Sequence, residues 1–136
     1  MQLRSHVITD PLFDRTIMLL VGGTPADVRA FLEMRHGRDY SLANKDNECD
    51  DDKDDYNDGA EFHINGPDNL ETYYVWVKDP TPGLLHHEVF HLAHDVLHVA
   101  GVTFTDESEE AFAYWSEHVY AQMFALLFDV TPAAVQ

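Results

Sequence analysis

His87, Glu88 and His91 form a His-Glu-x-x-His pattern inside an apolar run. At 3.6 residues per turn, His87 and His91 lie one above the other on a helix and can hold one metal ion between them. Glu88 points about 100° around the same helix, so its carboxylate can address a water on the metal instead of the metal itself. The spacing therefore predicts a zinc site in which Glu88 is the general base.

Two further histidines extend the same helix face. His94 and His98 follow His87 by seven and eleven residues, and these offsets return to within about 40° of the starting direction. The opposite face is apolar and must pack on a sheet or a second helix; it carries Leu85, Val89, Leu92, Val96 and Val99. We expect a central helix with one side in the core and one side lining a cleft, where His94 and His98 are cleft residues rather than ligands.

A catalytic zinc usually takes three protein ligands, so the histidine pair needs a partner. A third histidine six residues after His91 is excluded, because that position is Leu97. A glutamate from the next predicted helix is the other common solution. If Asp106 caps that helix, Glu109 is its third residue and is held in a capping box, whereas Glu110 projects from the first turn. We therefore predict Glu110 as the ligand, with Glu109 as the alternative.

The remaining pattern predicts an α+β fold. Residues 15–21 form an apolar strand, and a helix follows from the cap Thr24 to Gly37. Residues 60–65 and 72–78 are typical of a hairpin, the histidine helix runs from 81 to Gly101, and a last helix spans 106–128. Residues 1–14 show no clear period and are interpreted as a leader. One domain over residues 1–136 is expected at this length.

The second hairpin strand is rich in aromatic residues, with Tyr73, Tyr74 and Trp76. These side chains are more often core residues than substrate contacts. If residues 73–78 lie at the edge of the sheet, they could instead pair with an extended peptide. The cleft would then lie beside this strand.

The composition excludes several classes of protein. A formal charge of −17 on 136 residues repels phosphates and argues against a nucleic-acid binder. No apolar run is long enough for a membrane span, and the single cysteine, Cys49, excludes an internal disulfide. These features predict a cytoplasmic protein. They leave its oligomeric state open.

The acids are concentrated between residues 46 and 58, where eight acids accompany one lysine. Such a block repels itself and has little to bury, which predicts a mobile, solvated loop. A calcium loop of the EF-hand type is excluded. Aligning Gly59 with the glycine of that motif puts Tyr56 where an acid is needed and Asn65 at the closing glutamate.

The motif on its predicted helix, followed by Ser108-Glu109-Glu110-Ala111-Phe112-Ala113-Tyr114, resembles the small zincin-like proteins of tailed phages and prophages. It is similar more broadly to the gluzincins, and the resemblance covers about residues 72–128. It implies a minimal zincin-like domain, a small sheet packed on the metal helix and a C-terminal helix, with zinc held by His87, His91 and Glu110. Tyr114 occupies the position where thermolysin-type gluzincins carry an acid, and could bond a ligand or a reaction oxyanion.

Two functions are compatible with these observations. The first is a zinc-dependent hydrolase, most simply a peptidase acting on a peptide or protein, in which Glu88 deprotonates the zinc-bound water. The second is a catalytically silent zincin-fold protein, whose acidic surface binds a basic partner or imitates the charge of DNA.

Overall fold

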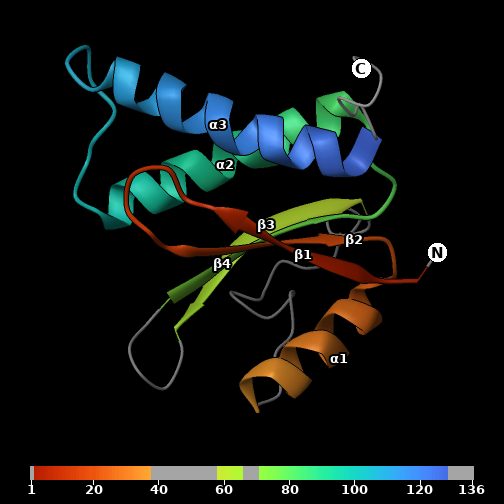
Figure 1. The fold of residues 1–136 in the computed structure, drawn as a ribbon. Helices are drawn as coiled ribbons and strands as arrows, with labels where there is room; N and C mark the ends of the chain where they lie inside the picture. The colour runs from red at the N-terminus through yellow and green to blue at the C-terminus, as the bar shows by residue number, and fades with distance from the viewer. Residues whose placement is uncertain (1, 38–57, 66–70, 129–136) are drawn as a thin grey trace.

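A four-stranded sheet lies between two helical layers in the computed structural model, which describes residues 2–37, 58–65 and 71–128 (Figure 1). Helices α2 and α3 cover one face of the sheet, and α1 lies on the other. The α+β class is confirmed. In chain order the elements are β1 (Arg4–Thr9), β2 (Thr16–Val21), α1 (Pro25–His36), β3 (Gly59–Asn65), β4 (Glu71–Val77), α2 (Pro82–Val99) and α3 (Glu109–Phe128).

The strands are arranged in the order β1-β2-β4-β3. The outer pairs, β1 with β2 and β3 with β4, are antiparallel, while the central strands β2 and β4 are parallel. The hairpin predicted from residues 60–65 and 72–78 is therefore present as β3 and β4. Because β2 and β4 are central and parallel, their pairing needs a long connection, which includes α1 and β3.

Both central strands are apolar along their length because helices cover both of their faces. Ile17, Leu19 and Val21 of β2 face α2 and α3, whereas Met18 and Leu20 face α1. Strand β4 alternates in the same way, with Tyr73, Val75 and Val77 on the α2 side and Tyr74 and Trp76 on the α1 side. All three predicted aromatic core residues of β4 are fully buried.

Helix α1 begins and ends as its sequence predicts. The Thr24 hydroxyl accepts from the Asp27 N–H at 3.2 Å, and the Asp27 carboxylate accepts from the Thr24 N–H at 2.9 Å, which forms a capping box. Gly37 ends the helix with a φ of 74°, a left-handed conformation that glycine adopts at little cost.

One interpretation of the sequence is wrong, and one conditional alternative does not apply. Residues 1–14 are not a leader, because Arg4–Thr9 forms the edge strand β1. Residues 73–78 do not form an edge, because β4 lies between β2 and β3. An extended peptide could therefore pair only with β1 or β3 among the described strands. The predicted acidic loop at 46–58 lies outside the described residues except for Asp58.

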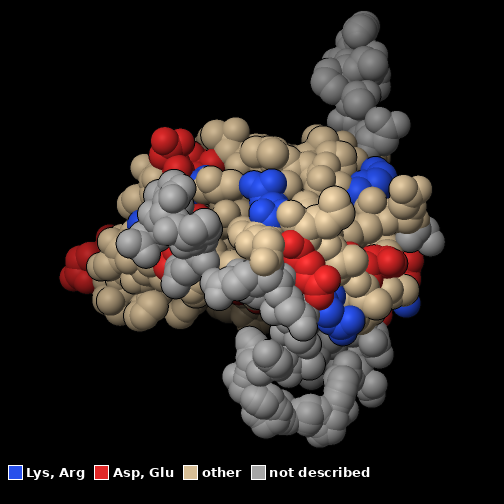
Figure 2. Space-filling view, turned by 90° about the horizontal axis from the view of Figure 1, so that it is seen from below, with Lys and Arg blue, Asp and Glu red and all other residues tan. Residues whose placement is uncertain are grey.

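The surface on the α1 side carries charges of both signs. Figure 2 shows acidic and basic side chains interspersed among other residues on the described part of this face. Within the described ranges, no helix combines the length and the apolarity that crossing a membrane requires.

Candidate metal centre

Helix α2 presents the predicted histidines to solvent. Thr81 caps the helix by accepting from the Leu84 N–H at 3.1 Å, and Pro82 occupies the first turn. The apolar face is buried as predicted at Leu85, Val89, Leu92 and Val96, whereas Val99 is 39% exposed. The opposite face carries four exposed histidines: His87, His91, His94 and His98.

His87 and His91 are brought together as the spacing predicts. Their ring centroids lie 4.8 Å apart, with the rings nearly perpendicular. The pKa of His91 is lowered by partial burial and then by the neighbouring His87 and His94. A lowered pKa favours the neutral imidazole, which is the form that binds a metal.

Glu88 points away from the histidines and into the interface between α2 and β3. Its side chain is only 5% exposed, and no hydrogen bond joins it to another residue in the part of the chain that the structure describes. Burial raises the pKa of Glu88, and the neighbouring His87 partly opposes that rise. A buried carboxyl with a raised pKa accepts and holds a proton more readily than an exposed carboxyl does.

Gly59 at the start of β3 leaves the space that Glu88 occupies. A Cβ atom at this position would lie 2.8 Å from the Trp76 carbonyl oxygen and 3.3 Å from Glu88 Oε2. The first distance is too short for any side chain. A glycine here therefore lets β3 approach both β4 and the Glu88 carboxylate.

Helix α3 begins three residues later than the sequence predicts. Asp106 does not cap it, because residues 105–108 form a turn in which the Thr105 N–H donates to Ser108 Oγ at 2.9 Å and the Ser108 N–H donates to Thr105 Oγ1 at 3.3 Å. Glu109 is therefore the first helical residue and is not held in a capping box. The reason for preferring Glu110 over Glu109 does not apply in this structure.

The structure does not bring Glu110 and Tyr114 to the histidine pair. Phe112 of α3 faces the core, and Glu110 and Tyr114 are each two residues from it, about 200° around the helix. Both side chains are exposed, and Tyr114 packs on His118 with ring centroids 4.3 Å apart. Glu110 and Tyr114 therefore lie on the face of α3 that is turned away from α2.

Ring contacts between α2 and α3 place Glu110 beyond His91 along the helix axis as well. His86 contacts Tyr120 at 6.1 Å between ring centroids, and His94 contacts Phe112 at 5.8 Å. In this antiparallel alignment Glu110 is level with residue 96, about 7.5 Å past His91 at 1.5 Å per residue. Across residues 2–37, 58–65 and 71–128, no three or more His, Cys, Asp or Glu side chains are grouped so that they could hold a metal ion.

A group of polar side chains between α2 and β3 was not predicted from the sequence. Glu61 and His63 on β3 face Asp95 on α2, and His63 Nδ1 lies 2.8 Å from Asp95 Oδ2. Burial, followed by a hydrogen bond with Asp95 and the charges of Asp95 and Glu88, raises the pKa of Glu61 to about 10. Glu61 therefore keeps its proton at neutral pH.

Two patterns in the sequence point to this group in retrospect. Asp95 follows Glu88 by seven residues, which places both acids on one helix face. Glu61 and His63 alternate with Phe62 and with Ile64, so they share the opposite face of β3. The sequence therefore contained a polar face on a strand and two acids on one face of a helix. Polar side chains that are buried between such elements need hydrogen-bond partners on the facing element.

Comparisons with known proteins add no assignment to this geometry. No protein-family model matches the chain, and neither the curated proteins nor the solved structures contain a match. The candidate site therefore rests on the residues of this chain alone.

Proposed function

We propose that this chain is a zinc-dependent hydrolase, most simply a peptidase, of the minimal zincin-like kind seen in phages. The observation that carries the proposal is the arrangement of Glu88, a buried carboxyl next in sequence to His87, whose exposed ring meets that of His91 edge to face. A cytoplasmic location is part of the same proposal.

The residues have separate roles in this reaction. Zinc, when bound, would supply a Lewis acid that polarises the scissile carbonyl and makes water more acidic. His87 and His91 would hold it through their ring nitrogens. Glu88 would accept a proton from the attacking water at a carboxylate oxygen and then donate it to the leaving amine.

In this proposal the third zinc ligand comes from α3. Glu110 is the candidate from the sequence, and it is exposed on the outer face of α3. Glu109 is the alternative, and its side chain lines a pocket between α2 and α3 together with His94. Only a change in the position of the first turn of α3 would bring either carboxylate to the histidine pair.

Zinc content tests the proposal directly. Purified protein dialysed against excess zinc should retain one ion per chain, measured by mass spectrometry of the metal. His87→Asn and His91→Asn should lose it, while His94→Asn and His98→Asn, on the same exposed stripe, should keep it. Wild type without stoichiometric zinc, or an unchanged content in His87→Asn, would show the proposal to be wrong.

The same measurement separates the two glutamates. Glu110→Ala should lower the zinc content and Glu109→Ala should not, if Glu110 is the third ligand. The two variants remove the same charge from adjacent positions of one helical turn, so each is the matched control of the other. The reverse result would assign the ligand to Glu109.

A second function is favoured by one observation, the absence of an assembled three-ligand group among the described residues. In that case the chain is a catalytically silent acidic interaction protein that binds a basic partner or imitates the charge of DNA. Glu88→Gln distinguishes the two functions, because it removes the proton acceptor and keeps the shape. Loss of hydrolysis supports the enzyme, whereas an unchanged biological effect in this variant supports the interaction protein.

A further inference from the structure

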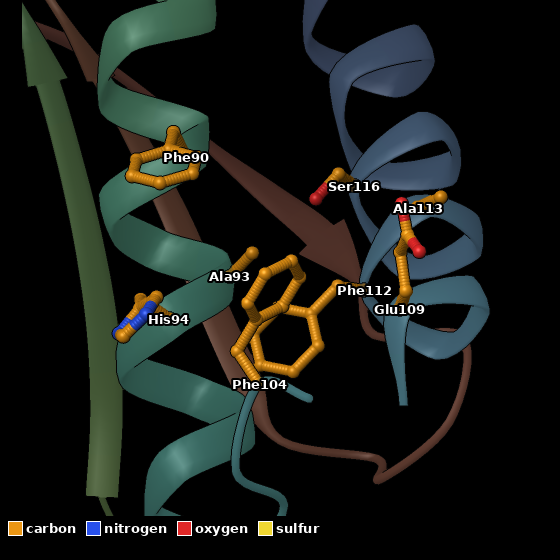
Figure 3. A pocket seen from close by; sticks show the side chains of 8 residues that line it. All are labelled: Phe90, Ala93, His94, Phe104, Glu109, Phe112, Ala113 and Ser116. Atoms are coloured by element: carbon orange, nitrogen blue, oxygen red, sulfur yellow. The ribbon is translucent and has the colours of Figure 1, made fainter. Parts of the chain in front are cut away.

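We propose that a pocket between α2 and α3 is a binding site for an aromatic ring that carries a primary amine on a short chain. The pocket needs no metal, so this proposal is independent of the proposed function. Its walls come from α2, from α3 and from the loop that joins them (Figure 3).

Three phenylalanine rings and a histidine make the pocket aromatic. Phe104 of the connecting loop meets Phe112 of α3 edge to face, with ring centroids 4.9 Å apart. His94 of α2 lies 5.8 Å from Phe112 and 6.0 Å from Phe90. Edge-to-face packing of this kind leaves ring faces and edges open to another aromatic ring.

Two of these rings are unusually exposed for their type. Phe90 is 60% exposed and Phe104 is 54% exposed. Covering both with one bound ring would remove apolar surface from water at two places at once, which favours binding.

The volume of the pocket limits the size of the occupant. Its volume is about 230 Å³. An apolar cavity of roughly 150 Å³ holds benzene, whereas drug-sized ligands need about 300 Å³ or more. The pocket therefore has room for one ring and a short chain, but not for two rings.

The polar groups at the pocket select a cationic end. Glu109 contributes a carboxylate from the first turn of α3, and Ser116 contributes a hydroxyl about two turns further along the same helix face. None of the described residues that line the pocket is a lysine or an arginine, and the chain carries a formal charge of −17. An ammonium group can pair with Glu109 and interact with the ring faces, whereas a carboxylate would be repelled.

Binding of matched probes tests this proposal by NMR titration of the ¹⁵N-labelled protein. Phenethylamine should shift the amide resonances of Phe90, Ala113 and Ser116 and saturate in the millimolar range or below. Two probes serve as controls: 3-phenylpropionate has the ring with the opposite charge, and ethylamine has the charge without the ring. Each should bind at least tenfold more weakly than phenethylamine.

Two variants locate the site and its charge. Ala113→Trp fills the pocket and should abolish binding, while Ala121→Trp, exposed on the same helix outside the pocket, should not. Glu109→Gln should reduce the preference for phenethylamine over 3-phenylpropionate by about tenfold, a change in selectivity that a purely structural role would not produce. Glu117→Gln, exposed on α3 and outside the pocket, is its control.

A peptide distinguishes the source of the amine. Phe-Gly-Gly with a free amino terminus should bind and its acetylated form should not, if the ligand is the terminal residue of a peptide. Binding of phenethylamine without the peptide would assign the site to a small free amine. Equal affinity for both charged probes, unchanged binding in Ala113→Trp, or self-association of the protein that occupies the pocket would overturn the proposal.

Discussion

The Glu61 side chain shows how strongly the fold controls one carboxyl group. Its Oε2 atom is buried without a hydrogen-bond partner among the described residues, and Asp95 and Glu88 add negative charge on the α2 side. In the unfolded chain the same group has its ordinary pKa of 4.5, whereas folding raises the pKa to about 10. Folding therefore takes up a proton at Glu61 over most of the accessible pH range.

This difference predicts how stability depends on pH. A raised folded-state pKa means that the contribution of Glu61 is fully present below pH 4.5 and is lost as the pH rises toward about 10. Glu61→Gln keeps the shape and a donor for Asp95 but cannot ionise. Its free energy of unfolding should resemble that of wild type at pH 5 and exceed it at pH 9, in urea denaturation at both values.

One control variant keeps this comparison specific to Glu61. Glu107 is an exposed acid in the turn before α3. In Glu107→Gln, the free energy of unfolding should change between pH 5 and pH 9 by almost the same amount as in wild type. A wild type as stable at pH 9 as Glu61→Gln would contradict the raised pKa.

Single residues were predictable where helical geometry alone decides their position. The exposed stripe from His87 to His98 follows from the 3.6-residue period. The partnership of Glu61 with Asp95 was not predictable, because it depends on how β3 is aligned with α2 across the sheet edge. The preference for Glu110 over Glu109 depended on Asp106 as the cap, whereas the Thr105–Ser108 turn makes Glu109 the first residue of the helix.

At the scale of elements, a single buried aspartate connects the β1–β2 loop to α3. Asp10 is 7% exposed and accepts from the backbone N–H groups of Leu12, Phe13 and Arg15 at 2.9, 3.0 and 3.1 Å. It also accepts from Trp115 Nε1 at 2.8 Å. One carboxylate thus fixes the turn and attaches it to the helix.

Removing that carboxylate should be costly. Asp10→Ala leaves the indole N–H of fully buried Trp115 without its acceptor and frees three backbone donors, so we expect a loss of about 3 kcal/mol or more in the free energy of unfolding. Asp10→Asn keeps one acceptor oxygen and should lose less. Chemical denaturation monitored by tryptophan fluorescence measures both.

Removal of a charge from so acidic a chain could itself be stabilising, and Glu117→Ala on the exposed side of α3 controls for it. That variant should change the free energy of unfolding by less than about 0.5 kcal/mol. A similar small change in Asp10→Ala would contradict the role of Asp10.

The types and order of most elements were predictable, but the edge strand was not. The capping box and Gly37 predicted the two ends of α1, and the apolar run predicted at residues 15–21 is present as β2 (Thr16–Val21). Strand β1 buries only Ile8 on its hydrophobic side, so its sequence lacks the alternation that identifies a strand. Its backbone is held by β2 and by Gln122 of α3, which accepts from the Thr9 N–H at 2.9 Å and donates to the Thr9 carbonyl at 2.8 Å.

At the scale of the whole molecule, two cores on opposite faces of the sheet must hold together a chain with a large net charge. The larger core lies under α2 and α3, and the smaller one under α1. The fold class followed from the pattern of elements, whereas the parallel pairing of β2 with β4 could not be deduced, because a long connection permits either strand order. The formal charge of −17, by contrast, is visible in the composition and opposes compactness through self-repulsion.

Self-repulsion predicts that added salt stabilises the protein. Screening lengths fall from about 30 Å at 0.01 M to about 10 Å at 0.1 M, so most of the gain should come at low ionic strength. Between 10 and 300 mM sodium chloride at pH 7, with a chelator present, we expect the thermal midpoint to rise by several degrees and then to level off. Potassium and tetramethylammonium chlorides should give the same curve, because screening depends on ionic strength and not on the cation. A rise that requires calcium or magnesium at matched ionic strength would contradict self-repulsion and indicate a specific cation site instead.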